Sequence, residues 1–397
     1  MKRKVVGVGK ITQTIEETTK YMWRNQKNRL FMLIMLGLML VYVLLFAPDF
    51  HSNYDQDMEE LRTEMTGNAV QAQNAKDNGH IVPSIMTGTT AYIEQEFEFG
   101  AQRELYTTIK HGDIYRYLEL KDVWAPTTTD TDIASLFYDI FGEDPLFIKN
   151  QAYREQVPNL NFHVVHEITS LQQIHLFLIG MGPLILLSGL IFMISEVHTK
   201  DLTLSTQKSG LPLRWQGYLL VQSLTALGFV LAFYAVFFGV FYLVNGLLHG
   251  FGGLFYPISL PFTGSGLTIG WFLLRTLPYI FILFILFTRL NTLISLWTGQ
   301  AVVSMGLLIF IVFFSKIYMD AYTGDVLPFN LAYLPTSYLS FGKIIIGEHG
   351  LTTGIADLDI YMSGLVVLGI TLAVTELILF VTSKRMTRQK YIAWGAN

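Results

Sequence analysis

The stretch that decides the fold is residues 30–47, LFMLIMLGLMLVYVLLFA, in which no residue carries a charge. A helix needs roughly 20 apolar residues to cross about 30 Å of hydrocarbon. The stretch is too long for the core of a secretory signal, it follows 29 residues of chain, and no small-x-small cleavage pattern comes after it. It therefore predicts a first transmembrane helix at 30–47 that is retained as an anchor.

The composition of the whole chain is typical of a membrane protein. Of 397 residues, 51% are hydrophobic and only 15% are charged, whereas about 25% of the residues of a soluble domain are charged. Further apolar runs lie at about 174–194, 217–248, 270–288, 298–317 and 360–382. We therefore expect an all-α membrane protein with six transmembrane helices. Because 217–248 is too long for one straight crossing, part of it should tilt or leave the membrane.

The distribution of charge predicts the orientation in the plasma membrane. Residues 1–29 contain eight Lys and Arg against two Glu, and the tail 383–397 contains four Lys and Arg and no acid. An excess of Lys and Arg marks cytoplasmic flanks, so both termini should be cytoplasmic, which requires an even number of spans. The loops 195–216 and 289–297 then fall inside, and 318–358 falls outside.

The segment 48–173 should be an external domain. Residues 49–172 contain 21 Asp and Glu against 8 Lys and Arg. Helical spacing of apolar residues predicts helices at 55–78, 91–120, 132–141 and 145–156, so the domain should be mainly helical. It could be a vestibule that contacts substrate or a partner, or a solvated cap that stabilises the outer ends of the spans.

The most informative loop is residues 195–214, SEVHTKDLTLSTQKSGLPLR. The second span ends in Glu196, an amphipathic piece follows, and Gly210 and Pro212 then end any helix. Taken alone, these residues favour an ordinary surface connector with snorkelling cations. The alternative is a helix at the cytoplasmic surface that transmits motion from a soluble partner.

This pattern resembles the ABC-2 family of exporter permeases, in which the second span ends in Glu, a short cytoplasmic coupling helix follows, and a Leu-Pro-x-Arg-like turn leads into the third span. The matching residues are Glu196, 202–208 and 211–214. The family also has short, partly re-entrant helices between the fifth and sixth spans, matched here around Pro328, Pro335 and Tyr338.

The resemblance covers the six-span layout and roughly residues 173–385, and it favours the subgroup with a sizeable domain after the first span. Where the family often has Gly-Thr after the acidic residue, this chain has Thr-Lys-Asp at 199–201. The resemblance implies that the 195–216 loop docks on a separate ATP-binding subunit. The implied contact residues are Glu196, Lys200, Asp201, Lys208, Pro212 and Arg214.

The resemblance further implies a second permease copy or a related permease, and outward transport of a hydrophobic or amphipathic cargo by alternating access. The chain should not hydrolyse ATP itself. Its nearest approach to a phosphate-binding loop, GVGKI at 7–11, lacks the upstream Gly and the Ser or Thr after the Lys. The chain contains no Cys, and we expect no catalytic residue, metal site, cofactor or nucleic-acid partner.

Glu376 lies inside the sixth apolar run. A charge there costs roughly 2.5–3.5 kcal/mol on insertion scales, so its carboxyl should face the bundle, be paired or be protonated. It could be a polar residue of a transport pathway, or it could snorkel to the inner interface. Two other classes of function stay open: a membrane sensor or scaffold whose external domain binds a ligand, and, less favoured, an intramembrane enzyme.

Overall fold

The computed structural model describes residues 2–46, 50–78, 91–120, 145–158, 160–200, 214–258, 267–320, 331–348, 360–386 and 390–391. These residues form two compact units. The first contains Met1–Val41, Ile174–Val244 and Gly270–Asn397, and the second contains Tyr42–Gln173 and Asn245–Ile269. The chain therefore passes from one unit to the other four times.

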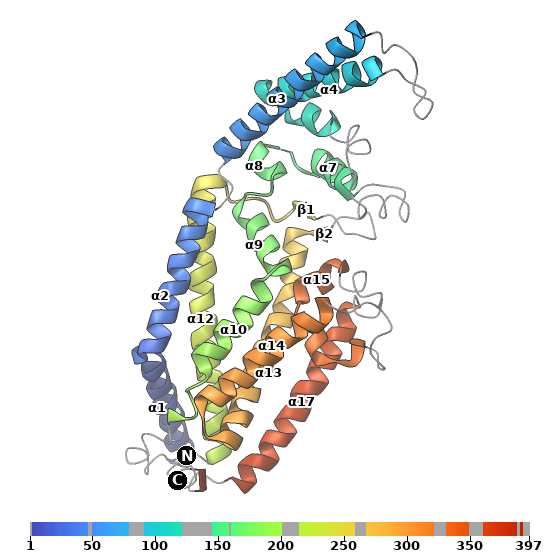
Figure 1. Ribbon diagram of the computed structural model, residues 1–397. Coiled ribbons are helices and arrows are strands. Elements are labelled where there is room, and N and C mark those ends of the chain that lie inside the picture. The colour runs from blue at the N-terminus through green and yellow to red at the C-terminus, as the bar shows by residue number, and fades with distance from the viewer. Residues whose placement is uncertain are drawn as a thin grey trace. The chain divides into compact units, whose positions relative to one another are not determined.

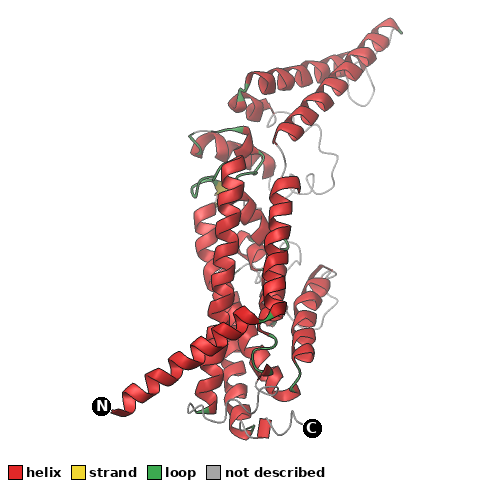
Figure 2. Ribbon diagram, turned by 90° about the vertical axis from the view of Figure 1, so that its left-hand side faces the viewer, coloured by secondary structure: helices red, strands yellow, loops and turns green. Residues whose placement is uncertain are grey.

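The first unit is a bundle of apolar helices that run alongside one another in Figures 1 and 2. Helix α1 is set at an angle to the bundle in Figure 2, and it is separated from α2 by a break at Asn25. The long elements are α1 (Lys2–Arg24), α2 (Gln26–Val41), α10 (Gly182–Ile194), α12 (Trp215–His249), α13 (Ile269–Thr298), α14 (Ala301–Asp320) and α17 (Tyr361–Arg385).

Within the described residues, four helical stretches are long and apolar enough to cross a membrane: Gln26–Leu44, Trp215–His249, Ile269–Thr298 and Tyr361–Arg385. A fifth is added if the bent pair that ends in α10 is one span. At most 39% of the apolar window of any of the four is buried. Since these windows direct most of their apolar side chains outward, they fit a hydrocarbon surrounding, and the chain is an α-helical membrane protein.

The number six stays a prediction. The apolar run at 298–317 corresponds to α14, whose described apolar part, Ala301–Phe314, is shorter than a full span. The predicted span at 174–194 is bent by 75° between Phe162–Ile179 and Gly182–Ile194. At the bend, a Cβ on Gly182 would overlap the Phe177 backbone, and Pro183 starts the new helix without needing an amide partner.

The prediction of an inner loop at 289–297 was wrong. Helix α13 continues through these residues to Thr298, and only residues 299–300 connect it to α14. The polar side chains that suggested a loop are instead buried inside the bundle, where several of them make hydrogen bonds to other helices. For example, the Asn291 amide donates to the Ile194 carbonyl at 3.1 Å.

Close approach between bundle helices depends on small residues. Gly189 of α10 lies against the Tyr234 hydroxyl of α12 and the Phe31 ring of α2, where a Cβ would overlap both. The Tyr234 hydroxyl also donates to the Leu186 carbonyl at 2.7 Å. These contacts join three helices around one point in the bundle.

A compact segment of short helices packs against α17. It comprises η2 (Leu331–Tyr333), η3 (Pro335–Tyr338) and α15 (Phe341–Ile346). The buried Tyr338 hydroxyl donates to the Ala332 carbonyl at 2.7 Å, and its ring lies against Gly364 of α17. The segment ends at Gly347, whose φ of 76° is the left-handed conformation favoured by Gly at a helix C-terminus.

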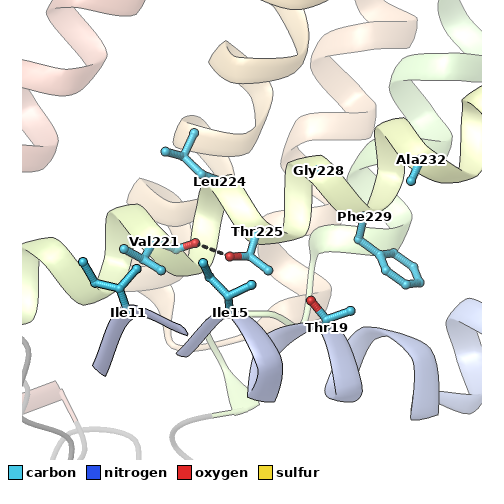
Figure 3. Close-up of a pocket in the computed structure, with 9 residues that line it drawn as sticks. All are labelled: Ile11, Ile15, Thr19, Val221, Leu224, Thr225, Gly228, Phe229 and Ala232. Atoms are coloured by element: carbon cyan, nitrogen blue, oxygen red, sulfur yellow. Dashed lines mark hydrogen bonds between the residues drawn. The ribbon is translucent and has the colours of Figure 1, made fainter. Parts of the chain in front are cut away.

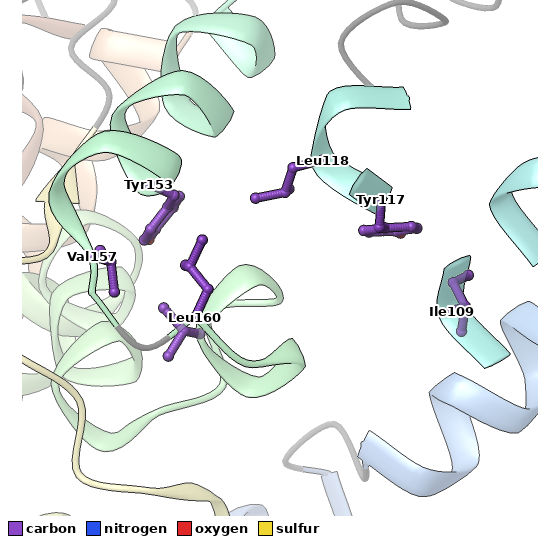
Figure 4. Packing of buried hydrophobic residues seen from close by; sticks show 7 residues of the cluster. Ile109, Tyr117, Leu118, Tyr153, Val157 and Leu160 are labelled. Carbon is purple, nitrogen blue, oxygen red and sulfur yellow. The ribbon is translucent and has the colours of Figure 1, made fainter. Parts of the chain in front are cut away.

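The second unit is mainly helical, with α3 (Phe50–Asp77), α4 (Ala91–His111), a helical stretch at 114–120, α7 (Pro145–Gln156), α8 (Phe162–Val165) and the start of α9 (Ser170–Ile179). The helices predicted at 55–78, 91–120 and 145–156 correspond to these elements, and the one at 132–141 lies outside the described residues. Figure 4 shows its buried core, which is formed by Ile109, Tyr117, Leu118, Tyr153, Val157, Leu160 and Val164.

The distant piece 245–269 is tied into the second unit by backbone hydrogen bonds. The amides of Ser170 and Leu171 donate to the carbonyls of Gly250 and Phe251 at 3.0 and 3.2 Å. The piece also holds a short antiparallel pair of β1 (Pro257–Ile258) and β2 (Leu267–Thr268). A fold domain confined to 48–173 would omit these contacts.

Candidate functional site

Helix α10 ends at Ile194, residues 195–199 form a turn, and Lys200 is again helical; we call these residues together the 195–200 turn. Its Glu196 carboxylate accepts a hydrogen bond from Asn25 at 2.6 Å and pairs with the Lys27 ammonium at 3.1 Å. The Lys27 ammonium also donates to the Ser195 hydroxyl at 2.7 Å. The turn is thus held at the break between α1 and α2.

The contacts of Glu196 favour its ionised form. Burial alone would raise the pKa of the Glu196 carboxyl, but hydrogen bonds from Asn25 and Lys27, the Lys27 charge and a longer bond from Tyr21 outweigh burial and hold this pKa below its ordinary value. Next along the chain, the buried Lys200 ammonium lies 4.4 Å from the centroid of the Tyr21 ring. Both charged side chains of the turn therefore face the α1–α2 junction.

His198 attaches the same turn to the bundle, and its side chain is only 2% exposed. Its Nδ1 lies 3.0 Å from the Gln222 Oε1 atom, and the Gln222 Nε2 atom donates to the Val197 carbonyl at 2.8 Å. Its Nε2 lies 2.9 Å from the Thr292 hydroxyl. The imidazole therefore bridges α12 and α13.

An ion pair lies beyond these groups. Arg289 donates from Nε to Oε1 of Glu376 and from Nη2 to Oε2 of the same carboxylate, the latter at 2.9 Å. Arg289 Nη1 also donates to the Ser223 hydroxyl at 3.1 Å. The Ser223 hydroxyl in turn lies 3.0 Å from the Thr292 hydroxyl. The groups form one continuous network, which we call the polar cluster: His198, Gln222, Ser223, Arg289, Thr292 and Glu376.

The two members of the ion pair differ in exposure. The Arg289 side chain is 7% exposed, whereas the Glu376 side chain is 41% exposed. A buried cation without a partner is costly, so the carboxylate is needed to keep the guanidinium inside the bundle. Of the alternatives expected for Glu376, the structure has the paired one, and its partner Arg289 lies in the segment that was predicted as a loop.

The residues expected to contact an ATP-binding subunit are only partly described. Glu196 and Lys200 lie in the 195–200 turn, and Arg214 is exposed immediately before α12. Asp201, Lys208, Pro212 and the whole predicted helix at 202–208 lie outside the described residues. Of the residues matched to the re-entrant segment, Pro335 and Tyr338 are in η3, and Pro328 lies outside the described residues.

Sequence reasoning missed the polar cluster as a unit. Ser223 lies within the apolar run 217–248, where hydroxyl residues are common because they can bond to their own helix, and Thr292 lies in the segment 289–297 that was predicted as a loop. A usable signal was the opposite charge of Arg289 and Glu376 within two apolar helices. Pairing them requires knowing that α13 continues past residue 288.

An apolar groove of about 630 Å³ lies between α1 and α12. Its one described hydroxyl on α12, that of Thr225, donates to the Val221 carbonyl at 2.7 Å, as Figure 3 shows. The groove therefore offers an apolar surface, and none of its lining residues is charged. Its lining consists of Ile11, Ile15, Thr19, Val221, Leu224, Thr225, Gly228, Phe229 and Ala232.

Comparison of this chain with known protein families, with curated proteins and with solved structures finds no match. The candidate site therefore stands on its own geometry. That geometry is a turn at the end of α10 that is bonded on one side to the α1–α2 junction and on the other to α12 and α13.

Proposed function

We propose that this chain is the membrane-spanning permease subunit of an ATP-driven ABC-type exporter. The observation that carries the proposal is the double attachment of the 195–200 turn. Glu196 bonds to the α1–α2 junction, and His198 bonds to α12 and α13. A displacement of this turn would therefore act on several helices at once, which is what a point of coupling to a motor subunit requires.

The direction and partners come from the charge pattern and the family resemblance. The cationic segments at 1–29 and 383–397 favour a cytoplasmic position for both termini, and the 195–200 turn then lies on the side where ATP is available. A separate ATP-binding subunit would dock on the 195–216 loop, and a second permease copy or a related permease would complete the pathway. Its cargo would be hydrophobic or amphipathic.

The test is recovery of the full chain from its native membranes in mild detergent, followed by photolabelling with an ATP analogue. We expect a separate ATP-labelled polypeptide to co-purify with the chain. Glu196→Gln removes the charge that holds the turn, and it should lower ATP-dependent cargo export with the chain still inserted. Glu60→Gln in α3, an exposed acid, is the matched control and should leave export unchanged.

Two results would count against the proposal. One is a purified, folded chain with which no ATP-binding polypeptide associates. The other is a Glu196→Gln variant that exports cargo at the normal rate while its partner hydrolyses ATP normally.

A further inference from the structure

The hydrogen bonds around His198 determine which of its nitrogens carries a proton. The Val197 carbonyl can only accept, so the Gln222 group that faces it must be the amide NH₂. The Gln222 oxygen then faces the imidazole Nδ1 at 3.0 Å. Because that oxygen can only accept, Nδ1 must carry a hydrogen in every state of the ring.

The other nitrogen has no such constraint, because it faces hydroxyls. Nε2 lies 2.9 Å from the Thr292 hydroxyl and 3.4 Å from that of Ser223. A hydroxyl can donate or accept. A neutral ring would accept from Thr292, and a protonated ring would donate to it. Both states are therefore compatible with the same heavy-atom positions.

The two hydroxyls also have alternative acceptors on their own helices. The Ser223 hydroxyl lies 2.7 Å from the Leu219 carbonyl, and the Thr292 hydroxyl lies 2.9 Å from the Thr288 carbonyl. When Nε2 donates, both hydroxyls can turn their protons to these carbonyls. When Nε2 accepts, Thr292 must turn its proton to His198, and Ser223 can turn its own to Thr292.

We propose that His198 is a proton-binding site, and that its occupancy decides the direction of the hydrogen bonds that connect the Arg289–Glu376 ion pair to the 195–200 turn. In the neutral state, every donor points the same way, from the Arg289 guanidinium through Ser223 and Thr292 to Nε2, and from Nδ1 through Gln222 to the Val197 carbonyl. Aligned hydrogen bonds polarise and strengthen one another.

Binding of one proton from water places it on Nε2 and reverses that bond. The Thr292 oxygen then accepts from the imidazolium, and the Thr292 hydroxyl turns its hydrogen to the Thr288 carbonyl. The Ser223 hydroxyl can turn its own hydrogen to the Leu219 carbonyl, and each hydrogen stays on its own oxygen. The aligned chain is interrupted at Thr292, and the net charge of the polar cluster rises by one. The contacts between the ion pair and the 195–200 turn remain, but their hydrogen bonds no longer all point in the same direction.

Charged groups of both signs lie along the polar cluster and on the 195–200 turn. Among the described residues, Arg289 approaches from α13, and Glu376 stands behind it on α17. On the turn itself, Glu196 is paired with Lys27, and Lys200 faces the Tyr21 ring. Thus the Glu376 carboxylate of the cluster and the Glu196 carboxylate of the turn offset the added proton, while the cations oppose it.

Nitrogen-15 magnetic resonance of the full chain in lipid bilayers, with labelled histidine, tests the proposal directly. The chain has nine histidines, so the His198 signals are assigned by their loss in His198→Gln. At pH 8 we expect a hydrogen on Nδ1 and none on Nε2. On stepwise acidification to pH 5, we expect the Nε2 signal to become that of a protonated nitrogen. An Nε2–H tautomer at pH 8, or a ring that stays neutral to pH 5, overturns the proposal.

A second variant keeps the test decisive if His198→Gln does not fold. Thr292→Val removes the hydroxyl that faces Nε2 and should shift the His198 Nε2 signal. Thr276→Val is the matched control, because Thr276 lies on the same helix, is equally buried and bonds to the Phe272 carbonyl in the same way. It should leave His198 unchanged. If both variants give the same His198 signals, the proposed contact is wrong.

The proton site refines the proposed function, because it says how the coupling turn could be regulated. Its test is independent of that function, since it reads the imidazole in the permease chain without an ATPase partner or a cargo. Loss of the exporter proposal would leave the resonance result standing, and a negative resonance result would leave the exporter proposal untouched.

Discussion

At the residue scale, the ion pair between Arg289 and Glu376 is the charged feature that most constrains the bundle. The guanidinium is 7% exposed and the carboxylate is 41% exposed, so removing the carboxylate strands a buried cation. Removing the Arg289 cation leaves the Glu376 carboxylate, which is already partly exposed at the surface of the bundle. The two deletions should therefore differ in cost.

Glu376→Gln should lower the free energy of unfolding by about 1–3 kcal/mol, less than the full cost of a broken buried pair because the carboxylate is partly exposed. Arg289→Gln should cost less, and the double variant should cost less than the sum of the two. Thermal unfolding in detergent measures all three.

The exposed pair of Lys20 and Glu16 is the control, and Glu16→Gln should leave the melting temperature nearly unchanged, because water screens an exposed pair. Additive effects at Arg289 and Glu376 would contradict the pairing.

The lowered pKa of Glu196 predicts a dependence of stability on pH. A carboxyl whose pKa is lower in the folded state stabilises the fold at pH values above its unfolded pKa, and this contribution is lost as the pH falls through the folded pKa. The wild type should therefore exceed Glu196→Gln in melting temperature by a constant margin above about pH 6, and the margin should shrink below about pH 4.5. Glu60→Gln should show no such convergence, and a margin that grows on acidification would exclude the assigned contacts.

At the element scale, the sequence identified most helices and misplaced the features that depend on pairing. Apolar length is local, so the helices around 30–47, 217–248 and 360–382 follow from composition alone. The continuation of α13 through 289–297 does not, because Arg289 and Asn291 bond to groups on α10, α12 and α17 that are distant in the sequence. The bend before Gly182 was signalled only by a Gly-Met-Gly-Pro sequence that occurs often by chance. Of the candidate site, Glu196 and Glu376 could be found from sequence, but the hydroxyls of Ser223 and Thr292, which connect Arg289 to His198, could not.

The contact of α10 with α2 and α12 predicts a strong effect of one methyl group. Gly189→Ala places a Cβ against Tyr234 and Phe31 and should destabilise the bundle by about 1–3 kcal/mol through overpacking. Gly306→Ala in α14 is the control, because no atom lies within 4 Å of a Cβ at that position. Melting temperatures in the same detergent compare the two. Equal effects would mean that α10 does not approach its neighbours as closely as described.

At the scale of the whole molecule, the charge pattern and the helices together predict a topology. Both termini should lie on the cytoplasmic side, and residues 50–78 on the other. A reporter that fluoresces only in the cytoplasm should be active when fused after residue 397. Gly67→Cys places a single thiol on α3 where a Cβ faces open space, and it should react with an impermeant maleimide from outside, since the chain has no Cys of its own. A silent tail reporter, or a thiol at this position that does not react, would refute the topology.

The division of the second unit over two separate pieces of chain has a practical consequence. A recombinant fragment limited to residues 50–173 would lack the strand pair and the backbone acceptors at Gly250 and Phe251. Binding assays or antibodies raised with such a fragment would sample a surface that the intact protein does not present. A soluble fragment that keeps the fold of the second unit must also contain residues 245–269. A linker would join them to residues 50–173 in place of the hydrophobic segment 174–244.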